Sequence, residues 1–584
     1  MPKLTIDGKE LEVEAGTNLI EAARALGIEV PHYCYHPGLS IAGQCRLCMV
    51  DIEKTPRPTI ACNTQVAEGM VVHTQTERVK ETRRSIMEFH LINHPLDCPV
   101  CDQAGECWLQ IYYMQHGLYD PRMVDEKVRK PKAVPLGPHV ILDAERCILC
   151  SRCVRFCDEV TGTGELGIFH RGDHSEIGLF PGRDLDNKYS GNVVDICPVG
   201  ALTDRDFRFQ VRVWYLDSTK SICPGCARGC NIEVHTSRRR PHHNEGRRVA
   251  RLKPRFNADV NRWWICDDGR YGFGFVDDPT RLTRPIARDG ATRVSGSPTY
   301  PGSPRASDAL RLHTPTDRAG PSAPATKITW EAAIAAVVDA LGRLDPAEMG
   351  IVASPRMANE DLFALKQLVE GRGLPPVGFR VPPRVPGDQD RLLIRADKNP
   401  NTRGAELIGL DGDVAAILAA ARAGRIRLLW IFGHDLFQSA WPEAEVASAL
   451  EAVETLIWTG SNANPTSARA HWILPAAAWV EREGTFTNFQ GRVQRFRQAL
   501  EPLGEARPEW EILGLVLGAL GAPVTASRAE HWFRALATAV PAFAGLTYQN
   551  LGDGGQPVRA RALPAQLSLL GEASEGAVEA PSDV

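Results

Sequence analysis

The cysteines are the residues of this chain whose type and spacing point most directly to chemistry. All sixteen lie between Cys34 and Cys266, and the residues from 267 to 584 contain none. They form five groups: Cys34, Cys45, Cys48 and Cys62; Cys98, Cys101 and Cys107; Cys147, Cys150, Cys153 and Cys157; Cys197 alone; and Cys223, Cys226, Cys230 and Cys266. Iron–sulfur clusters need this arrangement, because short loops supply several thiolates and a distant cysteine completes the set. The cysteines therefore predict electron transfer.

The first group follows a segment that predicts the β-grasp fold of [2Fe–2S] ferredoxins. Residues 4–6 and 11–13 have the pattern of two short strands joined by a turn, and Thr17 or Asn18 can cap the helix that ends at Gly27. Four cysteines could equally hold structural zinc. The hairpin and the helix favour a [2Fe–2S] cluster instead. Its ligands would be Cys34, Cys45, Cys48 and Cys62.

The second group has three cysteines and needs a fourth ligand to hold a four-iron cluster. The three are Cys98, Cys101 and Cys107. His94 lies at a reachable offset, after a helix predicted over residues 77–93. Imidazole is a cluster ligand in some proteins and raises the reduction potential, whereas an isolated histidine at a helix end can simply cap that helix. Chemistry alone leaves both interpretations of His94 open. His90 is interpreted as a surface histidine.

The third group is the strongest single signal in the sequence. Its spacing, C-x2-C-x2-C-x3-C, is that of half a bacterial two-cluster ferredoxin, in which the fourth cysteine serves the other cluster. The set predicted for one [4Fe–4S] cluster is Cys147, Cys150, Cys153 and Cys197. If His94 is also a ligand, four clusters with four ligands each leave Cys157 without a set. If His94 is not a ligand, Cys157 must complete the set that contains Cys98.

The last group predicts a further [4Fe–4S] cluster, with structural zinc as the alternative. Its ligands would be Cys223, Cys226, Cys230 and Cys266. A basic run, residues 237–248, lies between the third and fourth of these. Such a run is either a solvated loop or a docking patch for an acidic partner. His242 and His243 lie in it, but four cysteines complete the set without them.

The overall composition excludes some other classes of function. A formal net charge of -4 gives no support to nucleic-acid binding. The first residues lack the basic segment and apolar run of a signal peptide, and no apolar run reaches the roughly 18 residues of a membrane-spanning helix. We therefore expect a cytoplasmic chain that meets the membrane only through partners. Sixteen thiols then indicate metal ligation rather than disulfides.

The rest of the chain must position these groups or bind partners. Residues 289–326 are rich in glycine, serine and proline, which predicts a flexible linker. From residue 327 short apolar segments, among them residues 377–381, alternate with helical ones. This order predicts a doubly wound parallel α/β sheet. Residues 433–436 and 460–467 lie at predicted strand ends, where such sheets bind ligands, although glycines there also serve simply to build the turns.

Several segments resemble one family closely. NHPLDCPVCDQAGECWLQ, RCILCSRCVRFCDEV, DICPVGALTD and SICPGCARGCNIEVH are similar to signatures of the large iron–sulfur subunit, the G subunit, of bacterial NADH:quinone oxidoreductase, respiratory complex I. HWILPAAAWVEREGTFTNFQGRVQRFRQAL resembles the C-terminal region that this family shares with molybdopterin oxidoreductases. The resemblance is close over residues 1–285 and looser over 327–515. The gap between Cys230 and Cys266 is longer than usual for the family, and the 289–326 linker resembles an insertion.

The resemblance implies a function and settles the ligand sets left open above. It implies that His94 is a ligand with Cys98, Cys101 and Cys107, and that Cys157 is not a ligand. The chain would hold one [2Fe–2S] and three [4Fe–4S] clusters and no molybdopterin, with the Cys223 cluster off the main electron route. It would pass electrons from NADH and flavin towards quinone, while a membrane arm translocates protons. The implied partners are the flavin- and NADH-binding subunit, a small [2Fe–2S] subunit and a cluster-bearing subunit that leads to quinone, on the cytoplasmic side of the bacterial inner membrane.

We predict a multidomain α/β and α+β protein with no catalytic site of its own. The predicted domains are 1–76 ([2Fe–2S] β-grasp), 77–118 ([4Fe–4S] held by one histidine and three cysteines), 138–210 (ferredoxin-like [4Fe–4S]), 216–275 (molybdopterin-oxidoreductase-type [4Fe–4S]), 289–326 (linker), 327–565 (molybdopterin-oxidoreductase-like α/β) and 566–584 (tail). Three other classes are weighed against this interpretation. A molybdenum enzyme would usually ligate its metal with a cysteine, selenocysteine or serine, and no cysteine follows Cys266. An iron hydrogenase would need further cysteines downstream, and a zinc scaffold would contain no iron.

Overall fold

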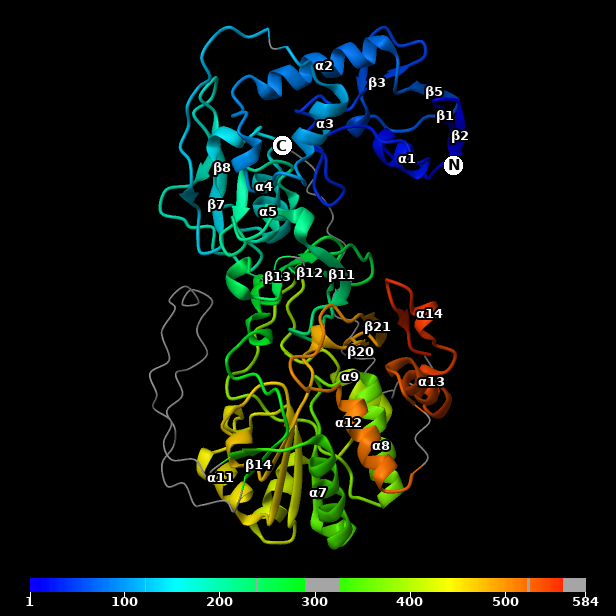
Figure 1. Ribbon diagram of the computed structural model, residues 1–584. Helices are drawn as coiled ribbons and strands as arrows, with labels where there is room; N and C mark the ends of the chain where they lie inside the picture. The colour runs from blue at the N-terminus through cyan, green and yellow to red at the C-terminus, as the bar shows by residue number, and fades with distance from the viewer. Residues whose placement is uncertain (121, 238–239, 241, 289–324, 523–525, 560–584) are drawn as a thin grey trace. The chain divides into compact units, whose positions relative to one another are not determined.

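The computed structural model describes residues 1–120, 122–237, 240, 242–288, 325–522 and 526–559. The chain divides into two units (Figure 1). The first contains Met1–Ser218 and His235–Phe273, and the second contains Thr219–Val234 and the described residues from Gly274 onward. The predicted linker lies outside the described residues except for its last two, which belong to a strand, and the predicted tail lies outside them entirely. None of the described helices is both long enough and apolar enough to cross a lipid bilayer.

A five-stranded sheet and one helix form the N-terminal part of the first unit, as predicted for a β-grasp fold. Leu4 and Ile6 alternate along β1, so both enter one apolar core, which the buried face of α1 covers. The strand order is β2-β1-β5-β3-β4, with β1 and β5 parallel. Asn18 caps α1 by accepting a hydrogen bond from the N–H of Glu21 at 3.1 Å. The bounds are β1 Lys3–Ile6, β2 Lys9–Glu12, α1 Leu19–Ala25, β3 Met49–Ile52, β4 Thr59–Ile60 and β5 Met70–His73.

Two helices surround the second cysteine group. Helix α2, Glu77–Leu91, begins where the Thr76 hydroxyl accepts a hydrogen bond from the N–H of Val79 at 3.2 Å. It ends two residues before the predicted end. Helix α3, Trp108–His116, lies against α2 (Figure 1), and Met87 and Tyr112 enter the same buried cluster. The segment between these helices contains all of the predicted His94 set except Cys107, which immediately precedes α3.

Small antiparallel sheets surround the third cysteine group. Strand β7 pairs with β6 and β10, and β8 pairs with β9. Helix α4 continues directly into a π-helix, Phe156–Thr161, which contains Cys157. The bounds are β6 Val134–Pro135, β7 Val140–Leu142, α4 Arg152–Arg155, β8 Leu166–Phe169, β9 Glu176–Leu179, α5 Asn192–Ile196 and β10 Leu202–Asp204. Further along the chain follow β11 Asp217–Ile222, β12 Asn231–Thr236, β13 Val249–Pro254 and α6 Asp267–Tyr271.

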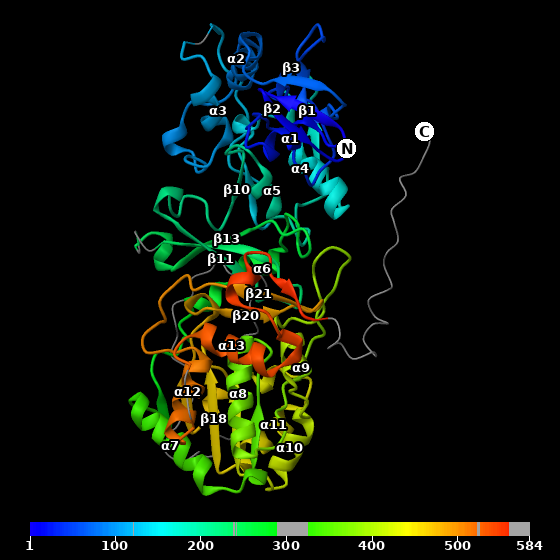
Figure 2. The ribbon, with the colours of Figure 1, turned by 90° about the vertical axis from the view of Figure 1, so that its right-hand side faces the viewer.

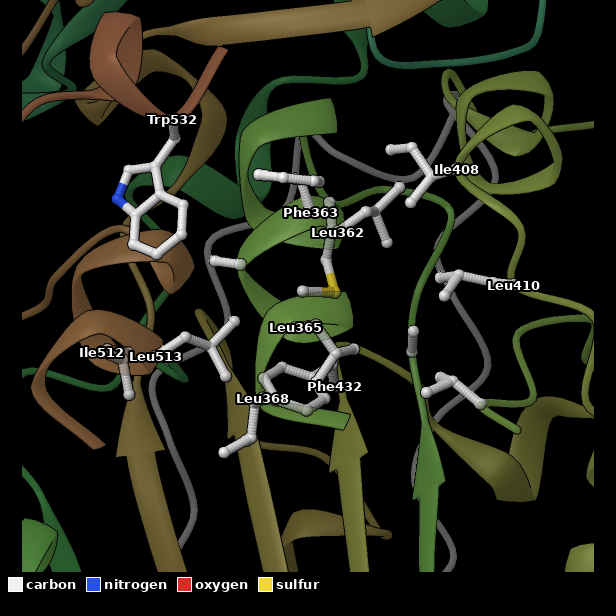
Figure 3. Packing of buried hydrophobic residues seen from close by; sticks show 14 of the residues in the cluster. Leu362, Phe363, Leu365, Leu368, Ile408, Leu410, Phe432, Ile512, Leu513 and Trp532 are labelled. Atoms are coloured by element: carbon white, nitrogen blue, oxygen red, sulfur yellow. The ribbon is translucent and has the colours of Figure 1, made fainter. Parts of the chain in front are cut away.

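Six strands of the second unit form a mostly parallel sheet with helices on both faces. The order is β15-β14-β19-β18-β17-β16, and the four strands from β16 to β19 are parallel. Successive side chains of β17 point to opposite faces. Phe432 therefore packs against α8 and α12 (Figure 3), whereas Ile431 packs on the side of α10 and α11. Figure 2 shows α8 and α12 alongside β18. This is the predicted α/β architecture, with an antiparallel pair, β14 and β15, added at one edge.

The predicted strand at residues 377–381 is wrong. Gly378 makes only single bridges, to Val352 and Gly412, and no ladder continues from it. Its neighbours Val377 and Phe379 are buried, so the segment is apolar because it is packed, not because it belongs to the sheet. The bounds in this unit are β14 Ile286–Arg288, β15 Ala325–Lys327, α7 Trp330–Arg343, β16 Met349–Val352, α8 Asn359–Arg372, α9 Thr402–Ile408, α10 Val414–Arg422, β17 Leu428–Phe432, α11 Glu443–Ala452, β18 Thr455–Gly460, β19 Trp472–Pro475, β20 Gly484–Thr487, β21 Arg492–Phe496, α12 Glu509–Ala519, α13 Ala529–Ala539, α14 Tyr548–Leu551 and β22 Gln556–Pro557.

Glu360 is a fully buried carboxyl in the first turn of α8. Its Oε1 accepts hydrogen bonds from the hydroxyls of Thr485 and Tyr548, each at 2.9 Å, and its Oε2 accepts one from the N–H of Thr485 at 2.9 Å. Burial raises the pKa of Glu360 from its ordinary 4.5 to about 7. The folded state therefore holds the Glu360 proton more tightly than the unfolded state does. The resulting stability is present in full below pH 4.5 and is lost as the pH rises towards 7.

We expect Glu360→Gln to remove this pH dependence. A glutamine amide can donate to both hydroxyls while its oxygen still accepts from the N–H of Thr485, so the site should tolerate it. At pH 8 the variant should be more stable than the wild type by roughly 3 kcal/mol, and at pH 4.5 the two should be equal. Thermal unfolding followed by tryptophan fluorescence at both pH values measures this. Glu451→Gln, on the exposed face of α11, is the control and should change neither value. Equal pH dependence in Glu360→Gln and the wild type would contradict the expectation.

Candidate iron–sulfur sites

The structure brings the four cysteines of the first set together. All four are buried, where the loop after α1 meets the loops around β3 and β4. Hydrogen bonds from the thiols of Cys45 and Cys62 lower the pKa of Cys34, and the same contacts raise the pKa values of the two donors. A hydrogen bond with Cys62 lowers the pKa of Cys48. The four sulfurs therefore form one connected group. Within the described ranges, no three or more His, Cys, Asp and Glu side chains surround a position for a metal ion, so hydrogen bonds, burial and shared cavities define these sets.

Backbone N–H groups point at the cysteine sulfurs in several of the loops. The contacts are Tyr33 N to Cys45 Sγ at 3.5 Å, Leu149 N to Cys147 Sγ at 3.4 Å, Gly225 N to Cys223 Sγ at 3.5 Å and Gly269 N to Cys266 Sγ at 3.4 Å. Such donors stabilise a thiolate and tune the potential of a bound cluster. A sulfur that receives an N–H group is suited to act as a metal ligand.

Three side-chain-bearing residues between cysteines have left-handed backbone conformations. Arg46 has φ 59°, Leu149 has φ 55° and Ser151 has φ 59°. The left-handed region is unfavourable for residues with a Cβ. Its alternation with right-handed residues turns successive N–H groups towards one centre, and concavities of this kind bind anions, iron–sulfur clusters included. The fold therefore holds these loops in a shape that suits a negatively charged cluster.

The His94 imidazole is buried and has no hydrogen-bond partner for its Nδ1 among the described residues. It lines a cavity of about 360 Å³ together with Cys98 and Cys107. Burial, with a smaller contribution from the charge of Arg146, lowers the pKa of His94 to about 4. The imidazole is therefore neutral at pH 7, which is the form that ligates metals. An unpartnered ring nitrogen that faces two thiols fits a cluster ligand better than a helix cap.

Cys101, the remaining member of this set, lies under a glycine. A Cβ added at Gly200 would be 2.5 Å from the Sγ of Cys101. Gly200 follows the Cys197-Pro-Val segment, so the loop of one predicted set closes over a cysteine of another. This contact requires a residue without a side chain.

The third set lines one small cavity. The thiols that face it are those of Cys147, Cys150, Cys153 and Cys197. Cys157 does not line this cavity, and its thiol instead donates a hydrogen bond to the carboxylate of Glu165, whose charge adds to burial in raising the pKa of Cys157. Glu165 is itself buried and accepts from the Thr163 hydroxyl at 2.6 Å. The separation that the ligand count suggested is thus visible in the side-chain contacts.

We expect Cys157→Ser to leave the cluster content unchanged. A serine hydroxyl can donate to Glu165 as the thiol does, so the π-helix keeps its contact. Iron and sulfide analysis should give the wild-type content, and every cluster signal in low-temperature EPR should remain. Cys153→Ser is the matched control four residues earlier, and it should remove about four iron atoms per chain. Loss of a cluster in Cys157→Ser would overturn the assignment.

The fourth predicted set has members in both units. Cys223, Cys226 and Cys230 belong to the second unit, where the N–H of Cys223 donates to the carbonyl of Cys230 at 2.9 Å and closes the loop. Cys266 belongs to the first unit, where it precedes α6. The joint set of four therefore stays a prediction. All four cysteines are buried.

His90 is not the surface histidine that the sequence suggested. Its ring packs edge-on against Tyr33, with centroids 5.0 Å apart, and its Nε2 lies 3.3 Å from the carbonyl oxygen of Cys45. Burial lowers the pKa of His90. A long-range contact between α2 and the first cysteine loop creates this environment, and no spacing rule could reveal it. His90 thus adds a side chain to the surroundings of the first set.

The other features singled out in the sequence have mostly internal contacts. In the basic run, Arg247 forms an ion pair with Asp206 at 3.0 Å, and residues 238, 239 and 241 lie outside the described ranges. At the strand ends of the second unit, the hydroxyl of Thr466 donates to Asp435 at 2.9 Å and accepts from the N–H of Leu436 at 2.8 Å. The two candidate ligand loops of the sheet are therefore hydrogen-bonded to each other.

Five family models match the chain. In order along the sequence they describe a 2Fe-2S iron-sulfur cluster binding domain (residues 2–77), the NADH-ubiquinone oxidoreductase-G iron-sulfur binding region (83–122), the ferredoxin-like domain of NADH-quinone oxidoreductase subunit 3 (137–203), the molybdopterin oxidoreductase Fe4S4 domain (216–278) and molybdopterin oxidoreductase (399–518). The chain thus contains 2Fe–2S and 4Fe–4S binding domains and a domain of the molybdopterin oxidoreductase type.

Curated relatives agree with these matches. A NADH-quinone oxidoreductase G subunit of Rhizobium meliloti, the one numbered 2, is 30% identical, over 95% of this chain and 84% of that protein. The mitochondrial NADH-ubiquinone oxidoreductase 78 kDa subunit of Candida albicans is 30% identical, over 88% of this chain and 81% of that protein. The NADH-quinone oxidoreductase G subunit of Rickettsia bellii is 37% identical, over 64% of this chain and 49% of that protein, so the match spans about half of that relative's length.

Among solved structures, a chain of an NAD+-reducing [NiFe]-hydrogenase in the H2-reduced state is 28% identical, with a TM-score of 0.32, over 36% of this chain and 91% of that chain. The two relatives that are covered over four-fifths of their length, with the domain matches, are decisive. This chain belongs to the family of the G subunit of NADH-quinone oxidoreductase.

Proposed function

We propose that this chain carries electrons in the NADH-oxidising arm of a NADH:quinone oxidoreductase. Family membership supports this, as do the 2Fe–2S and 4Fe–4S binding domains. The proposed donor is the subunit that binds NADH and flavin, together with a small [2Fe–2S] subunit. The proposed acceptor is a cluster-bearing subunit that leads to quinone. Proton translocation would take place in a membrane arm, and the chain would lie on the cytoplasmic side of the bacterial inner membrane through these partners.

We propose one [2Fe–2S] and three [4Fe–4S] clusters. Their ligands would be Cys34, Cys45, Cys48 and Cys62; His94, Cys98, Cys101 and Cys107; Cys147, Cys150, Cys153 and Cys197; and Cys223, Cys226, Cys230 and Cys266. The observation that carries this proposal is the cavity that the four thiols of the third set share, while Cys157 is hydrogen-bonded to Glu165 outside it. The unpartnered Nδ1 of His94 supports the second set.

The chemistry asked of the residues is modest. Iron–sulfur clusters, when bound, exchange single electrons without making or breaking bonds to a substrate. The cysteine thiolates and the neutral His94 hold them, and the backbone N–H groups at the sulfurs offset their negative charge. Burial of the ligands excludes water. No general acid, general base or nucleophile is needed.

The second unit is proposed to be a scaffold without molybdopterin. Its candidate ligand loops are hydrogen-bonded to each other, and its sequence after Cys266 offers no cysteine to ligate molybdenum. It would pack against partner subunits instead. The domain boundaries predicted from the sequence are part of this proposal.

Metal analysis of the anaerobically purified chain tests the proposal. We expect about 14 iron atoms and matching inorganic sulfide per chain, from one two-iron and three four-iron clusters. Molybdenum should be absent. EPR during a reductive titration should resolve the two-iron signal from the four-iron signals by temperature. A chain that binds zinc in place of iron would refute the proposal, and stoichiometric molybdenum would make the second unit an enzyme.

His94→Cys should lower the reduction potential of one [4Fe–4S] cluster and keep its iron. A thiolate carries a negative charge that the neutral imidazole lacks, so it disfavours the addition of an electron. Potentiometric EPR titration measures the change, and the signals of the other clusters provide the internal reference. His90→Asn, which retains a polar side chain near the Cys45 carbonyl, is the control and should leave this cluster unchanged. An unshifted potential in His94→Cys would show that His94 does not bind iron.

A further inference from the structure

Arg152 is a buried arginine between two of the proposed cluster sites. It is the first residue of α4, directly before Cys153, and its side chain is 3% exposed. Its Nη1 donates a hydrogen bond to the carbonyl of Ile196 at 3.1 Å, and its Nη2 donates one to the carbonyl of Tyr35. Ile196 precedes Cys197, and Tyr35 follows Cys34. One guanidinium thus ties the first cysteine set to the third.

The remaining contacts of Arg152 leave its charge unpaired. The guanidinium carbon lies 4.8 Å from the centre of the Trp108 ring, and Nε is buried without a hydrogen-bond partner in the described part of the chain. Both of its hydrogen bonds go to neutral carbonyl groups, and no described carboxylate forms an ion pair with it. Burial lowers the pKa of Arg152, and the charges of cysteines from both sets oppose this effect.

We propose that Arg152 is a positioning residue for electron transfer, whose buried charge raises the reduction potentials of both the [2Fe–2S] cluster and the Cys147 [4Fe–4S] cluster. Burial of an unpaired cation is costly unless an anion is near. Both clusters, with their thiolate ligands, supply that anion, and a one-electron reduction makes each of them more negative. An arginine stays protonated at every relevant pH, so its effect is constant. The inference rests on the proposed function, because it requires clusters at both sets.

Arg83 provides a comparison within the same unit. It is fully buried on α2, and its Nη2 donates to the carbonyl of Met49 at 3.1 Å, next to Cys48. Its Nε and Nη1 have no partner among the described residues. Burial lowers the pKa of Arg83 to about 10, with the charge of Cys48 opposing it. Arg83 thus contacts the surroundings of the first set alone, whereas Arg152 contacts those of two.

Arg155 provides a second comparison, one turn after Arg152 on the same helical segment. Its Nη2 donates to the carbonyl of Cys34 at 2.5 Å and to that of Cys150 at 3.4 Å. Arg155 is only half-buried. Solvent and salt screen a partly exposed charge much more than a buried one. Removal of the same formal charge at Arg155 should therefore have a smaller effect.

Potentiometric EPR titration of the purified chain tests the proposal. In Arg152→Gln, both midpoint potentials should fall by about 59 mV or more, which is a tenfold change in each one-electron equilibrium. Arg152→Lys keeps the charge and should stay close to the wild type. Arg83→Gln should lower the [2Fe–2S] potential alone, and Arg155→Gln should shift both potentials less than Arg152→Gln does. Iron analysis of every variant shows whether the clusters are retained.

Several outcomes would overturn the inference. Unshifted potentials in an Arg152→Gln chain with full iron would do so, as would an equal fall in Arg152→Lys or in Arg155→Gln. If Arg152→Gln loses iron, Arg152→Lys decides: retained clusters at wild-type potentials support the role of the charge. Loss of iron in both variants would reduce Arg152 to a structural tie between loops. A wild-type chain without iron would instead refute the proposed function, so the two failures are distinct.

Discussion

Replacement of Gly200 by alanine should remove about four iron atoms per chain, together with the EPR signal of the His94 set. The added Cβ would lie 2.5 Å from the Sγ of Cys101, 3.2 Å from the Cβ of Gln103 and 3.4 Å from the Cδ of Arg146. A free thiol could rotate away from such a contact, but a thiolate fixed in a cluster cannot, because its position is set by the iron. The substitution therefore competes directly with ligation by Cys101. Iron analysis and low-temperature EPR measure the result.

Two comparisons make this expectation specific. The signals of the Cys147 set should persist in Gly200→Ala, since the third set lines its own cavity. Gly274→Ala is the control, because a Cβ there would meet no atom within 4 Å. It should retain about 14 iron atoms. A Gly200→Ala chain with full iron and an unaltered His94 signal would mean that Cys101 is not a ligand in the arrangement we propose.

Arg482→Met should destabilise the second unit by about 3–5 kcal/mol. Arg482 is almost fully buried, pairs with Asp361 and lies 3.1 Å from Glu509. Burial raises the pKa of Glu509 to about 7, and the charge of Arg482 opposes that rise. Without the arginine two buried carboxyls lose their counter-ion, and each must either stay charged at high cost or take up a proton. Denaturant unfolding followed by the fluorescence of the buried Trp430 and Trp458 reports on this sheet.

An exposed pair provides the control for this experiment. Arg384 lies 2.6 Å from Glu443, and both side chains are about half exposed. Arg384→Met should cost less than about 1 kcal/mol, because solvent already screens the pair and ordering two long side chains offsets its attraction. If Arg482→Met cost no more than Arg384→Met, the buried pair would not be a determinant of stability.

The sequence was sufficient where function depends on spacing. The four thiols of the third set lie in one cavity, as the C-x2-C-x2-C run and the later Cys-Pro predicted. Alternation along β1, the Asn18 cap and the succession of strands and helices in the second unit also correspond to local patterns. These features depend on residues near one another in the chain, or on ligands whose type is distinctive.

The sequence was insufficient where the environment of a residue comes from distant segments. His90 was misinterpreted because its neighbours, Tyr33 and Cys45, lie more than forty residues away. Arginine is nearly always exposed, so nothing in the letters singles out Arg83 and Arg152 as buried. Residues 377–381 have strand-like composition, but burial by other segments, not ladder pairing, explains it. Gly200 resembles any other turn glycine until Cys101 is placed beneath it.

The left-handed residues in the cysteine loops link cofactor retention to assembly. Arg46, Leu149 and Ser151 each hold a conformation that costs roughly 1–2 kcal/mol, and the surrounding structure must offset that cost. Anything that binds only the native loop shape shifts the equilibrium towards it, whether an iron–sulfur core or a neighbouring subunit. By thermodynamic reciprocity, a partner that recognises these loops tightens the grip of the chain on its metal, and a metal-loaded chain binds that partner more strongly. Maturation of the clusters and incorporation into a larger complex are then one coupled equilibrium.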